Sequence, residues 1–366
     1  MTGRGIDQVL PHPSNPVLHE DYAQSAIDYV RLAEAANGPI PRRVGPSYVW
    51  GAALDEFESM RPDARIVNLE TSITRSEDFA RKGINYRMNP DNADCLKAAA
   101  LDCCVLGNNH VLDWGRRGLL DALATLERLE IKAVGAGRNF GEAVAPAVLD
   151  VAGSGRILVF SFAHVSSGTP RNWAATGETS GVNVLGELSE AGALRIAEQI
   201  ARAAQPGDLI IVSVHWGPNW GYEIPDAQRR FAHKLIEAAG VSIIHGHSSH
   251  HPKAIEVYRD RLILYGCGDF LNDYEGIRGY ENYRDDLVLM YFADVEAGRN
   301  LAAVEIVPLQ IRKFRLVRPA EEDVDWMQQT LDRESRRFGA GIELSRDGRL
   351  TLSWKRATSS DNHFGP

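Results

Sequence analysis

Cysteine is scarce in this sequence, basic residues are not in excess, and long apolar segments are missing. Four cysteines occur among 366 residues. Cys103 and Cys104 are adjacent within an apolar run, which is typical of buried small side chains and not of a disulfide framework. No apolar stretch reaches the roughly 20 residues of a membrane helix, and no signal-peptide core precedes Pro11. We therefore expect a cytoplasmic protein without a membrane span.

The charge balance is acidic, with a formal net charge of -9. This argues against nucleic acid as a partner, because binding to phosphate backbones requires clustered lysine and arginine. A bound cation would reverse the sign locally, so an anionic substrate remains compatible with the sequence. Apolar residues make up 44% and charged residues 24% of the chain, as in an ordinary soluble protein with a buried core.

Short apolar runs of strand length alternate with helical patterns over most of the chain. The runs expected to form strands span residues 66–69, 103–106, 131–134, 157–162, 209–214, 242–244 and 262–265. Between two of them, Leu119, Leu123 and Leu126 recur at helical spacing. This alternation predicts an α/β fold.

The pattern changes after Asp285, where longer alternating segments predict a hairpin of strands at 287–295 and 301–309. A polar helix and a last strand are expected to follow, over 321–337 and 350–354. We therefore expect a main domain over residues 1–312, and a helix-and-strand extension over 313–366 that packs on the same domain.

Residues with metal-binding side chains follow directly after four of the predicted strands. The candidate ligands are Glu70, Asn109, His215, His247 and His250. Because the carboxyl ends of strands in an open α/β sheet form one crevice, we expect these side chains to lie close together. A single histidine after a strand is more often an ordinary hydrogen-bonding residue. Carboxylate, carboxamide and imidazole groups gathered at one edge favour a metal site.

His110 and Asp113 lie beside the candidate ligand Asn109. His110 is predicted to act as a general acid or to stabilise a developing oxyanion. Asp113 follows three residues later, so it can hydrogen-bond His110, fix its tautomer and raise its pKa. The alternative role for Asp113 is to cap the helix that contains Leu119.

Five ordered motifs contain these residues and extend beyond them. They are Asn68-Leu69-Glu70-Thr71, Asn108-Asn109-His110 with Asp113 and Gly115, His215-Trp216-Gly217, Gly246-His247 with His250, and Tyr265 with Gly268-Asp269-Phe270. The set resembles the motifs of the CapA-type poly-γ-glutamate capsule biosynthesis family, which is related to calcineurin-like metallophosphoesterases. The resemblance covers roughly residues 3–310.

The resemblance implies a metallophosphatase-like fold, a four-layer α/β/β/α sandwich. It also implies two divalent metal ions, for which the mixed nitrogen and oxygen donors suit manganese, iron or zinc. Glu70 stands at the position of a bridging carboxylate, and Asn109 at that of the asparagine ligand of the second metal. The remaining expected ligands are His215, His247 and His250, and the resemblance assigns His110 and Asp113 to the catalytic histidine and its carboxylate partner.

One departure from the family pattern concerns the amino end. Family members begin with a strand that ends in Gly-Asp, whose aspartate is a metal ligand, followed shortly by Gly-Arg. This sequence begins Met1-Thr2-Gly3-Arg4-Gly5, so the first strand and its aspartate are missing and one metal position is doubtful. We expect the native start to lie upstream. The alternative is a naturally short chain with that metal position weakened, in which Asp7 is the nearest substitute ligand.

The residues around the predicted site suggest how a substrate is bound. Arg4 and Arg87 are candidates for binding an anionic group of a small molecule or of a poly-γ-glutamate-type polymer. Trp216 and His164 are expected to line the pocket, together with Trp220 and Glu223. Structural roles are the alternative for each of them.

Three functions are compatible with this sequence. The leading prediction is a metal-dependent hydrolase or transferase that acts on a phosphoester or a γ-glutamyl substrate. The alternative is a non-catalytic accessory or binding protein for the synthesis or export of poly-γ-glutamate. A third possibility is a relative that has lost its activity together with the missing aspartate. The sequence does not predict an oligomeric state.

Overall fold

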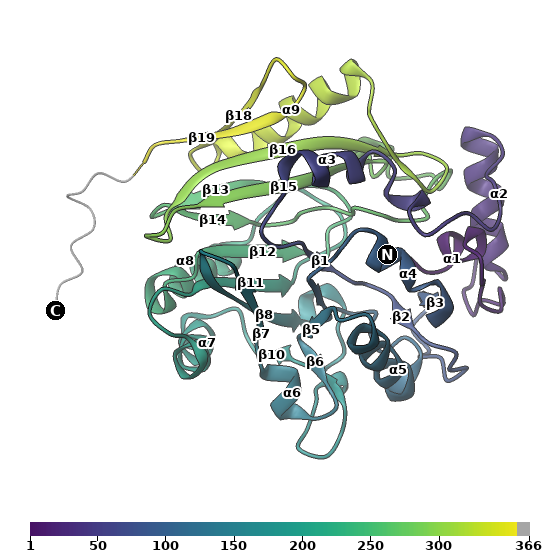
Figure 1. The fold of residues 1–366 in the computed structure, drawn as a ribbon, viewed down its shortest axis with the longest axis horizontal. Helices are drawn as coiled ribbons and strands as arrows, with labels where there is room; N and C mark the ends of the chain where they lie inside the picture. Colours follow the sequence, from purple (N-terminus) through teal and green to yellow (C-terminus); the bar gives the residue numbers. More distant parts are fainter. Residues whose placement is uncertain (357–366) are drawn as a thin grey trace.

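Residues 1–356 are described by a computed structural model of the chain, shown in Figure 1. Three parallel strands form a first sheet in the order β1-β4-β5. These strands are β1 (Ile66–Asn68), β4 (Cys103–Val105) and β5 (Lys132–Val134). Helix α5 (Gly115–Arg128) buries Leu119, Leu123 and Leu126 in the core that this sheet shares. The helical spacing of these leucines therefore reflects core packing.

A second sheet carries most of the predicted parallel strands. Its order is β10-β8-β11-β12-β14-β13, with β7 paired to β8. The bounds are β7 (Ala147–Val151), β8 (Gly155–His164), β10 (Val184–Leu185), β11 (Leu209–His215), β12 (Ile243–His247), β13 (Ile255–Tyr258) and β14 (Arg261–Leu264). Helices α7 (Glu190–Ala203) and α8 (Asp226–Ala239) bury their apolar stripes against one face, where Ile196 and Phe231 join the same core as Val212.

A third, antiparallel sheet completes the described chain, in the order β15-β16-β19-β18 with β17 beside β16. Its strands are β15 (Leu287–Val295), β16 (Leu301–Ile311), β17 (Leu316–Val317), β18 (Ala340–Leu344) and β19 (Leu350–Trp354), and α9 (Glu321–Arg336) packs on it. Because β19 pairs directly with β16, one sheet continues across the boundary predicted at residue 312.

The remaining elements are short and lie mostly in the first half of the chain. The helices are α1 (Gly5–Val9), α2 (Ala26–Asn37), α3 (Ala53–Met60), α4 (Asp94–Ala98) and α6 (Phe140–Val144). The strands are β2 (Ser72–Ile73) paired with β3 (Arg87–Met88), and β6 (Ala136–Gly137) paired with β9 (Gly181–Val182). Ser25 caps α2 by accepting a hydrogen bond from the Ile27 amide.

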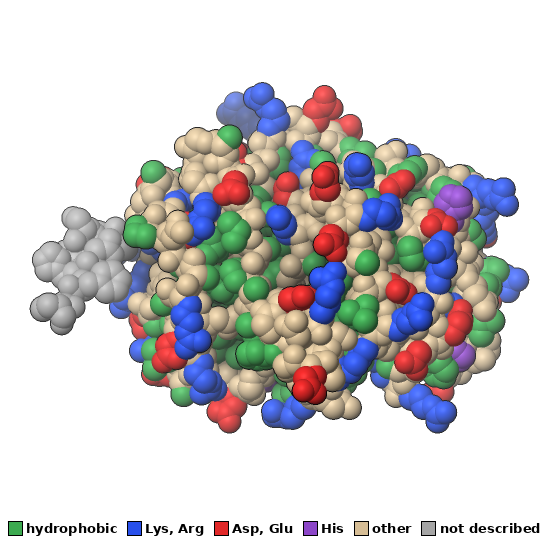
Figure 2. Space-filling view, turned by 60° about the horizontal axis from the view of Figure 1, so that its bottom comes forward, with side chains coloured by type: hydrophobic (Ala, Val, Ile, Leu, Met, Phe, Trp, Pro, Cys, Tyr) green, Lys and Arg blue, Asp and Glu red, His purple; other side chains and the backbone are tan. Residues whose placement is uncertain are grey.

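The predicted α/β class is confirmed, as a mixture of parallel and antiparallel sheets. Cys103 and Cys104 are free and fully buried, as the sequence predicted. None of the helices formed by residues 1–356 has the length and apolar character needed to span a bilayer. On the face shown in Figure 2, acidic and basic side chains are interspersed over the surface.

A buried carboxylate joins α8 to the second sheet. Glu256 on β13 accepts hydrogen bonds from Tyr265 Oη at 2.6 Å, His233 Nε2 at 3.0 Å and Arg229 Nη2 at 3.2 Å. Burial opposes ionisation, but the bonds from His233 and Tyr265 and the charge of Arg229 outweigh it, so the pKa of Glu256 lies below its ordinary value. The ionised carboxylate therefore stabilises the fold.

This shift predicts an acid-sensitive contribution to stability. Because the pKa is lower in the folded state, the contribution is present above the unfolded-state pKa and is lost as the pH falls through the folded-state value. We expect Glu256→Gln to lower the free energy of unfolding by about 2 kcal/mol at neutral pH. Urea unfolding measured over a pH series checks this. A difference between the two proteins that grows toward acid would contradict it.

Candidate functional site

The ends of four strands from two different sheets meet at one rim of the molecule. In the second sheet, His215 on β11 lies directly opposite His247 on β12. In the first sheet, the ends of β1 and β4 pair at Asn68 and Val105, and Glu70 and Asn109 follow shortly after. Apolar side chains of the two sheets pack against each other in a shared core, which brings the two pairs of strand ends together.

Glu70 lies at the centre of this group. Its Oε1 atom is 3.8 Å from His215 Nε2 and 3.9 Å from His110 Nε2, and its Oε2 atom accepts a hydrogen bond from Asn68 Nδ2 at 2.9 Å. The Asn109 side-chain oxygen lies 3.0 Å from His215 Nε2. A carboxylate, a carboxamide and two imidazoles from distant parts of the chain are therefore in mutual reach.

The histidines of β11 and β12 form a chain of contacts. His215 Nδ1 and His247 Nδ1 are 2.6 Å apart, so one proton lies between the two rings. Ser213 Oγ connects the other side, at 2.8 Å from His247 Nε2 and 3.0 Å from His245 Nδ1. Residues 213, 215, 245 and 247 share one face because side chains alternate along a strand.

His110 is held by Asp113. Its Nδ1 atom lies 2.7 Å from Asp113 Oδ2, and Lys82 Nζ donates to Asp113 Oδ1 at 2.9 Å and also to the Asn109 carbonyl. This leaves His110 Nε2 directed toward Glu70. Asp113 also accepts a hydrogen bond from the Tyr86 amide at 2.6 Å, so the carboxylate orients His110 from a fixed position.

Burial affects the titration of these groups in opposite directions for acids and bases. It lowers the pKa of His110 to about 4, although Asp113 raises it. Burial also lowers the pKa of His215 and of His247, while it raises the pKa of Glu70 to about 7. The three imidazoles are therefore neutral at neutral pH, with lone pairs available on nitrogen.

His250 lies in a different electrostatic environment. Both oxygens of Asp269 are 3.1 Å from His250 Nδ1. Burial lowers the pKa of His250, but the charge and hydrogen bond of Asp269 outweigh it and the net shift is upward. The ring also contacts Trp220 and Tyr274, with centroid distances of 5.3 Å and 5.1 Å. His250 is thus an ion-pair partner of Asp269, close enough to Glu70 and His215 to influence their pKa values.

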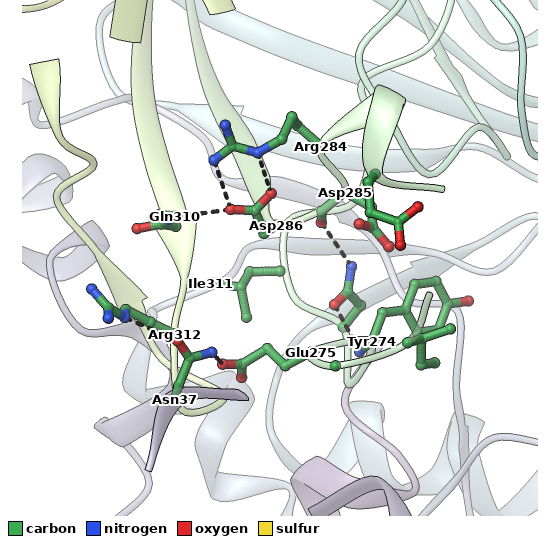
Figure 3. A pocket seen from close by; sticks show the side chains of 13 residues that line it. Asn37, Tyr274, Glu275, Arg284, Asp285, Asp286, Gln310, Ile311 and Arg312 are labelled. Carbon is green, nitrogen blue, oxygen red and sulfur yellow. Dashed lines mark hydrogen bonds and ion pairs between the residues drawn. The ribbon is translucent and has the colours of Figure 1, made fainter. Parts of the chain in front are cut away.

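Tyr274, which contacts His250, also lines a cavity of about 250 Å³ whose lining residues are mostly polar (Figure 3). Asn272 forms the connection, because its side chain donates to Asp269 at 2.9 Å and to the Asp285 carbonyl at 3.3 Å. Burial, Asp269 and Asp286 raise the pKa of Asp285 to about 7. The Asp286 carboxylate, in contrast, is paired with Arg284.

The donor atoms at the rim are of the types that bind a divalent cation, but their side chains are not arranged around a common ion position. Neutral imidazoles, a carboxylate and a carboxamide oxygen suit manganese, iron or zinc. Among residues 1–356, however, no group of three or more histidine, cysteine, aspartate or glutamate side chains is arranged to hold an ion. Because His215 and His247 are hydrogen-bonded to each other, their rings would have to separate for both to reach a cation.

Comparison with known proteins places the chain in a family. A family model described as Bacterial capsule synthesis protein PGA_cap matches residues 1–274. The chain belongs to this family.

Curated relatives of this PGA_cap family chain carry related names. A probable polyglutamine synthesis accessory protein of Mycobacterium tuberculosis is 44% identical over 355 residues, which is 96% of this chain and 93% of the relative. The PGA biosynthesis protein CapA of Bacillus subtilis is 27% identical over 288 residues, covering 78% and 70% of the two chains. The capsule biosynthesis protein CapA of Bacillus anthracis is 26% identical over 238 residues, covering 64% and 54%.

Arg4 does not face a substrate cavity in this PGA_cap family member. Its guanidinium is 3% exposed, donates to both oxygens of Asp273 at 2.6 and 3.1 Å, and donates to Glu20 at 3.1 Å. It also lies over the rings of Tyr29 and Tyr86. The predicted role in binding an anionic substrate is not supported, because the protein itself already occupies the guanidinium.

The same correction applies to Arg87 and Trp216. Arg87 is 6% exposed, donates to the carbonyl oxygens of Ser76 and Asn15, and stacks on Trp114. Trp216 is 2% exposed and donates its indole hydrogen to the Tyr265 carbonyl at 3.0 Å. Both side chains are therefore engaged in contacts within the protein, which favours the structural alternative over the predicted contact with a substrate.

The other residues predicted for the site lie in different environments. His164 is half-buried, and its Nδ1 atom lies 2.7 Å from Ser166 Oγ, which accepts a hydrogen bond from the Gly217 amide. It therefore lies beside the turn that follows His215. Glu223 is exposed. Asp7 is fully buried and accepts bonds from Ser14, Asn89 and Asn92, so the structure does not place it as a substitute ligand.

Three residues in contact with the candidate site were not predicted from the sequence. Asp269 lies in the segment after β14, which ends at Leu264, and the sequence indicated it only as part of a motif. His245 lies two residues before His247, which places both on one face of the strand. Lys82 lies in a loop, and nothing in the sequence around it predicts its contacts with Asn109 and Asp113.

Proposed function

We propose that this PGA_cap family protein is a metal-dependent hydrolase or transferase that acts on a phosphoester or a γ-glutamyl substrate in capsule or poly-γ-glutamate biosynthesis. The observation that carries the proposal is the convergence of Glu70, Asn109 and His215 from three strand ends, with His110 held beside them by Asp113. We also propose that the sheets form the metallophosphatase-like sandwich that the family resemblance implies.

In this proposal, Glu70, Asn109, His215 and His247 would hold a divalent manganese, iron or zinc ion. Such an ion would act as a Lewis acid for a phosphoryl or acyl oxygen and would activate water. His250 contributes through Glu70 and His215, and Asp269 raises its pKa. Lys82 lies at this rim and its side chain is 21% exposed, so in this proposal it pairs with an anionic part of the substrate, in competition with its bond to Asp113.

The chain's own residues supply the proton chemistry. Asp113 accepts a hydrogen bond from His110 Nδ1, which fixes the tautomer and directs Nε2 toward Glu70 and the reacting group. Because Nε2 carries a lone pair in this tautomer, His110 first takes up a proton there from the attacking water and then returns it to the leaving group. Asp113 prevents the ring from rotating out of position.

A second candidate function is supported by a different observation. Because no group of three or more histidine, cysteine, aspartate or glutamate side chains in residues 1–356 is arranged to hold an ion, we also consider a non-catalytic accessory protein whose rim binds the polymer or a synthesis partner. The word accessory in the name of the mycobacterial relative is in line with this alternative. The two candidates differ in one property, which is turnover.

The test is hydrolysis of phosphoesters and γ-glutamyl peptides by the purified chain, supplied in turn with manganese, iron and zinc. We expect His110→Ala to lower kcat by about 10²–10⁴-fold with a small effect on KM, because the histidine acts during the chemical step. His12→Ala is the matched control, since His12 is exposed and lies in the first loop. No turnover by the unchanged chain with any of the three metals would exclude the catalytic function and leave the accessory role. Turnover that His110→Ala retains in full would exclude the proposed role of His110.

A further inference from the structure

The segment at the carboxyl end of β8, over residues 164–173, borders the rim. Ser166 Oγ accepts a hydrogen bond from the Gly217 amide at 2.9 Å, which attaches the segment to the turn after β11. Gly168 passes so close to Asn109 that a β-carbon on this glycine would lie 3.5 Å from the Asn109 side-chain nitrogen. The segment therefore lies directly against the group of candidate ligands.

Cationic side chains from two other parts of the chain contact this segment. Lys82, which donates to the Asn109 carbonyl at the rim, has its Nζ atom 5.2 Å from the centroid of the Trp173 ring. Arg116, in the first turn of α5, donates from Nη2 to the Asn172 carbonyl at 3.2 Å. Both cations thus lie beside the end of the segment.

The segment adds a third cation of its own. Arg171 is exposed. Burial and the charge of Arg171 lower the pKa of His164, so the guanidinium lies near the first residue of the segment as well. We call Lys82, Arg116 and Arg171 the basic edge.

Two of these three cations have no acidic partner. Arg116 and Arg171 take part in none of the ion pairs formed within residues 1–356, and Arg116 Nη1 is buried without a hydrogen-bond partner there. Residues 79–90 and 164–173 contain neither aspartate nor glutamate. On a chain with a formal net charge of -9, such a local excess of positive charge draws anions toward the rim.

The arrangement of the basic edge suits several separate negative charges better than a single compact one. Lys82 lies at the rim itself, beside His110, whereas Arg116 and Arg171 contact or belong to the segment that leads away from it. A chain with one carboxylate on each unit can place successive charges against successive cations. Arginine is well suited to this role, because its planar guanidinium matches the geometry of a carboxylate.

We propose that the basic edge binds an anionic chain with one carboxylate on each unit, such as γ-linked glutamate, while one bond of that chain lies at the rim. Lys82 pairs with the unit at the rim, and Arg116 and Arg171 pair with units farther along the chain. The inference rests on the proposed function for the position of the reacting bond. It assigns to the basic edge the role in substrate binding that the sequence had suggested for Arg4 and Arg87.

The test is calorimetric titration of the full chain, freed of metal with a chelator so that turnover by the proposed mechanism does not interfere. The ligands are a γ-linked glutamate dimer, the corresponding pentamer and inorganic phosphate. We expect the pentamer to bind at least about fivefold more tightly than the dimer, and Arg171→Gln to weaken the pentamer about two- to fivefold, as for an exposed ion pair. The dimer is expected to bind this variant unchanged.

Two further variants accompany Arg171→Gln. Arg116→Gln is expected to weaken the pentamer to a similar extent without affecting the dimer. Arg259→Gln is the matched control, because Arg259 is 46% exposed and precedes the start of β14, at the end of the second sheet opposite His247. We expect this control to bind every ligand as the unchanged chain does. Thermal unfolding confirms that all three variants are folded.

Three results would overturn the basic edge. They are equal affinity for dimer and pentamer, an equal effect of Arg171→Gln and Arg259→Gln, and loss of phosphate binding by Arg171→Gln as large as its loss of pentamer binding, which would assign the edge to a compact anion. Turnover is measured separately with metal. Arginine-dependent binding of the pentamer without turnover would contradict the proposed catalytic function alone, whereas turnover without arginine-dependent binding would contradict the basic edge alone.

Discussion

His215→Ala is expected to abolish metal binding and to lower kcat/KM for any substrate of this protein by at least about 100-fold, because changes even to groups that only support metal ligands cost 10–100-fold in affinity or activity. The His215 side chain is in contact with Glu70, Asn109 and His247 together. Its removal therefore affects the whole group of donors. Metal content by elemental analysis and turnover are measured on the same preparation.

The size of this effect requires a control for stability, because His215 is fully buried on β11. His215→Gln has a similar volume and keeps a polar group at the position, so it separates loss of packing from loss of the imidazole. Thermal unfolding of both variants is compared with that of the native sequence. If His215→Ala keeps full metal content and turnover while remaining folded, the proposed centre is wrong.

Arg4→Met is expected to cost about 3–5 kcal/mol of unfolding free energy, the range for removing one partner of a buried ion pair. The side chains of Arg4, Glu20 and Asp273 are at most 2% exposed. Without the guanidinium, two carboxylates remain buried together with no cation between them. The loss of the contacts with Tyr29 and Tyr86 adds to the cost.

Arg31→Met is the control for this substitution. Arg31 pairs with Asp28 at 3.0 Å, but the two side chains are 72% and 38% exposed. Solvent screens such a pair, so we expect a change below about 1 kcal/mol. Urea unfolding of the two variants measures the contrast. Equal effects from Arg4→Met and Arg31→Met would show that the buried cluster does not stabilise the amino-terminal segment as inferred.

The sequence predicted the residues whose positions follow from local periodicity. Glu70, His215 and His247 each follow or end a run of strand length, and the strands of a layered sheet bring such positions to a common edge. The last strand, at 350–354, is also formed as predicted. Local patterns were sufficient in these cases because the strand itself determines which way the side chain points.

The arginines and Trp216 could not be assigned in this way, because their partners lie far away in the sequence. Arg4 is neutralised by Asp273, 269 residues later, and the indole of Trp216 bonds to a carbonyl 49 residues away. No pattern around either residue indicates such a contact. Whether a polar side chain serves the site or the fold is decided by tertiary packing, which the local sequence does not contain.

The most direct test of the central claim is an anomalous difference map from crystals of the protein soaked with manganese or zinc. If the strand ends form a metal centre, the strongest peak will lie between Glu70, Asn109, His215 and His247, and it will be absent from crystals of His215→Ala. A map with no peak at this rim, or with its strongest peak elsewhere on the molecule, would contradict the account.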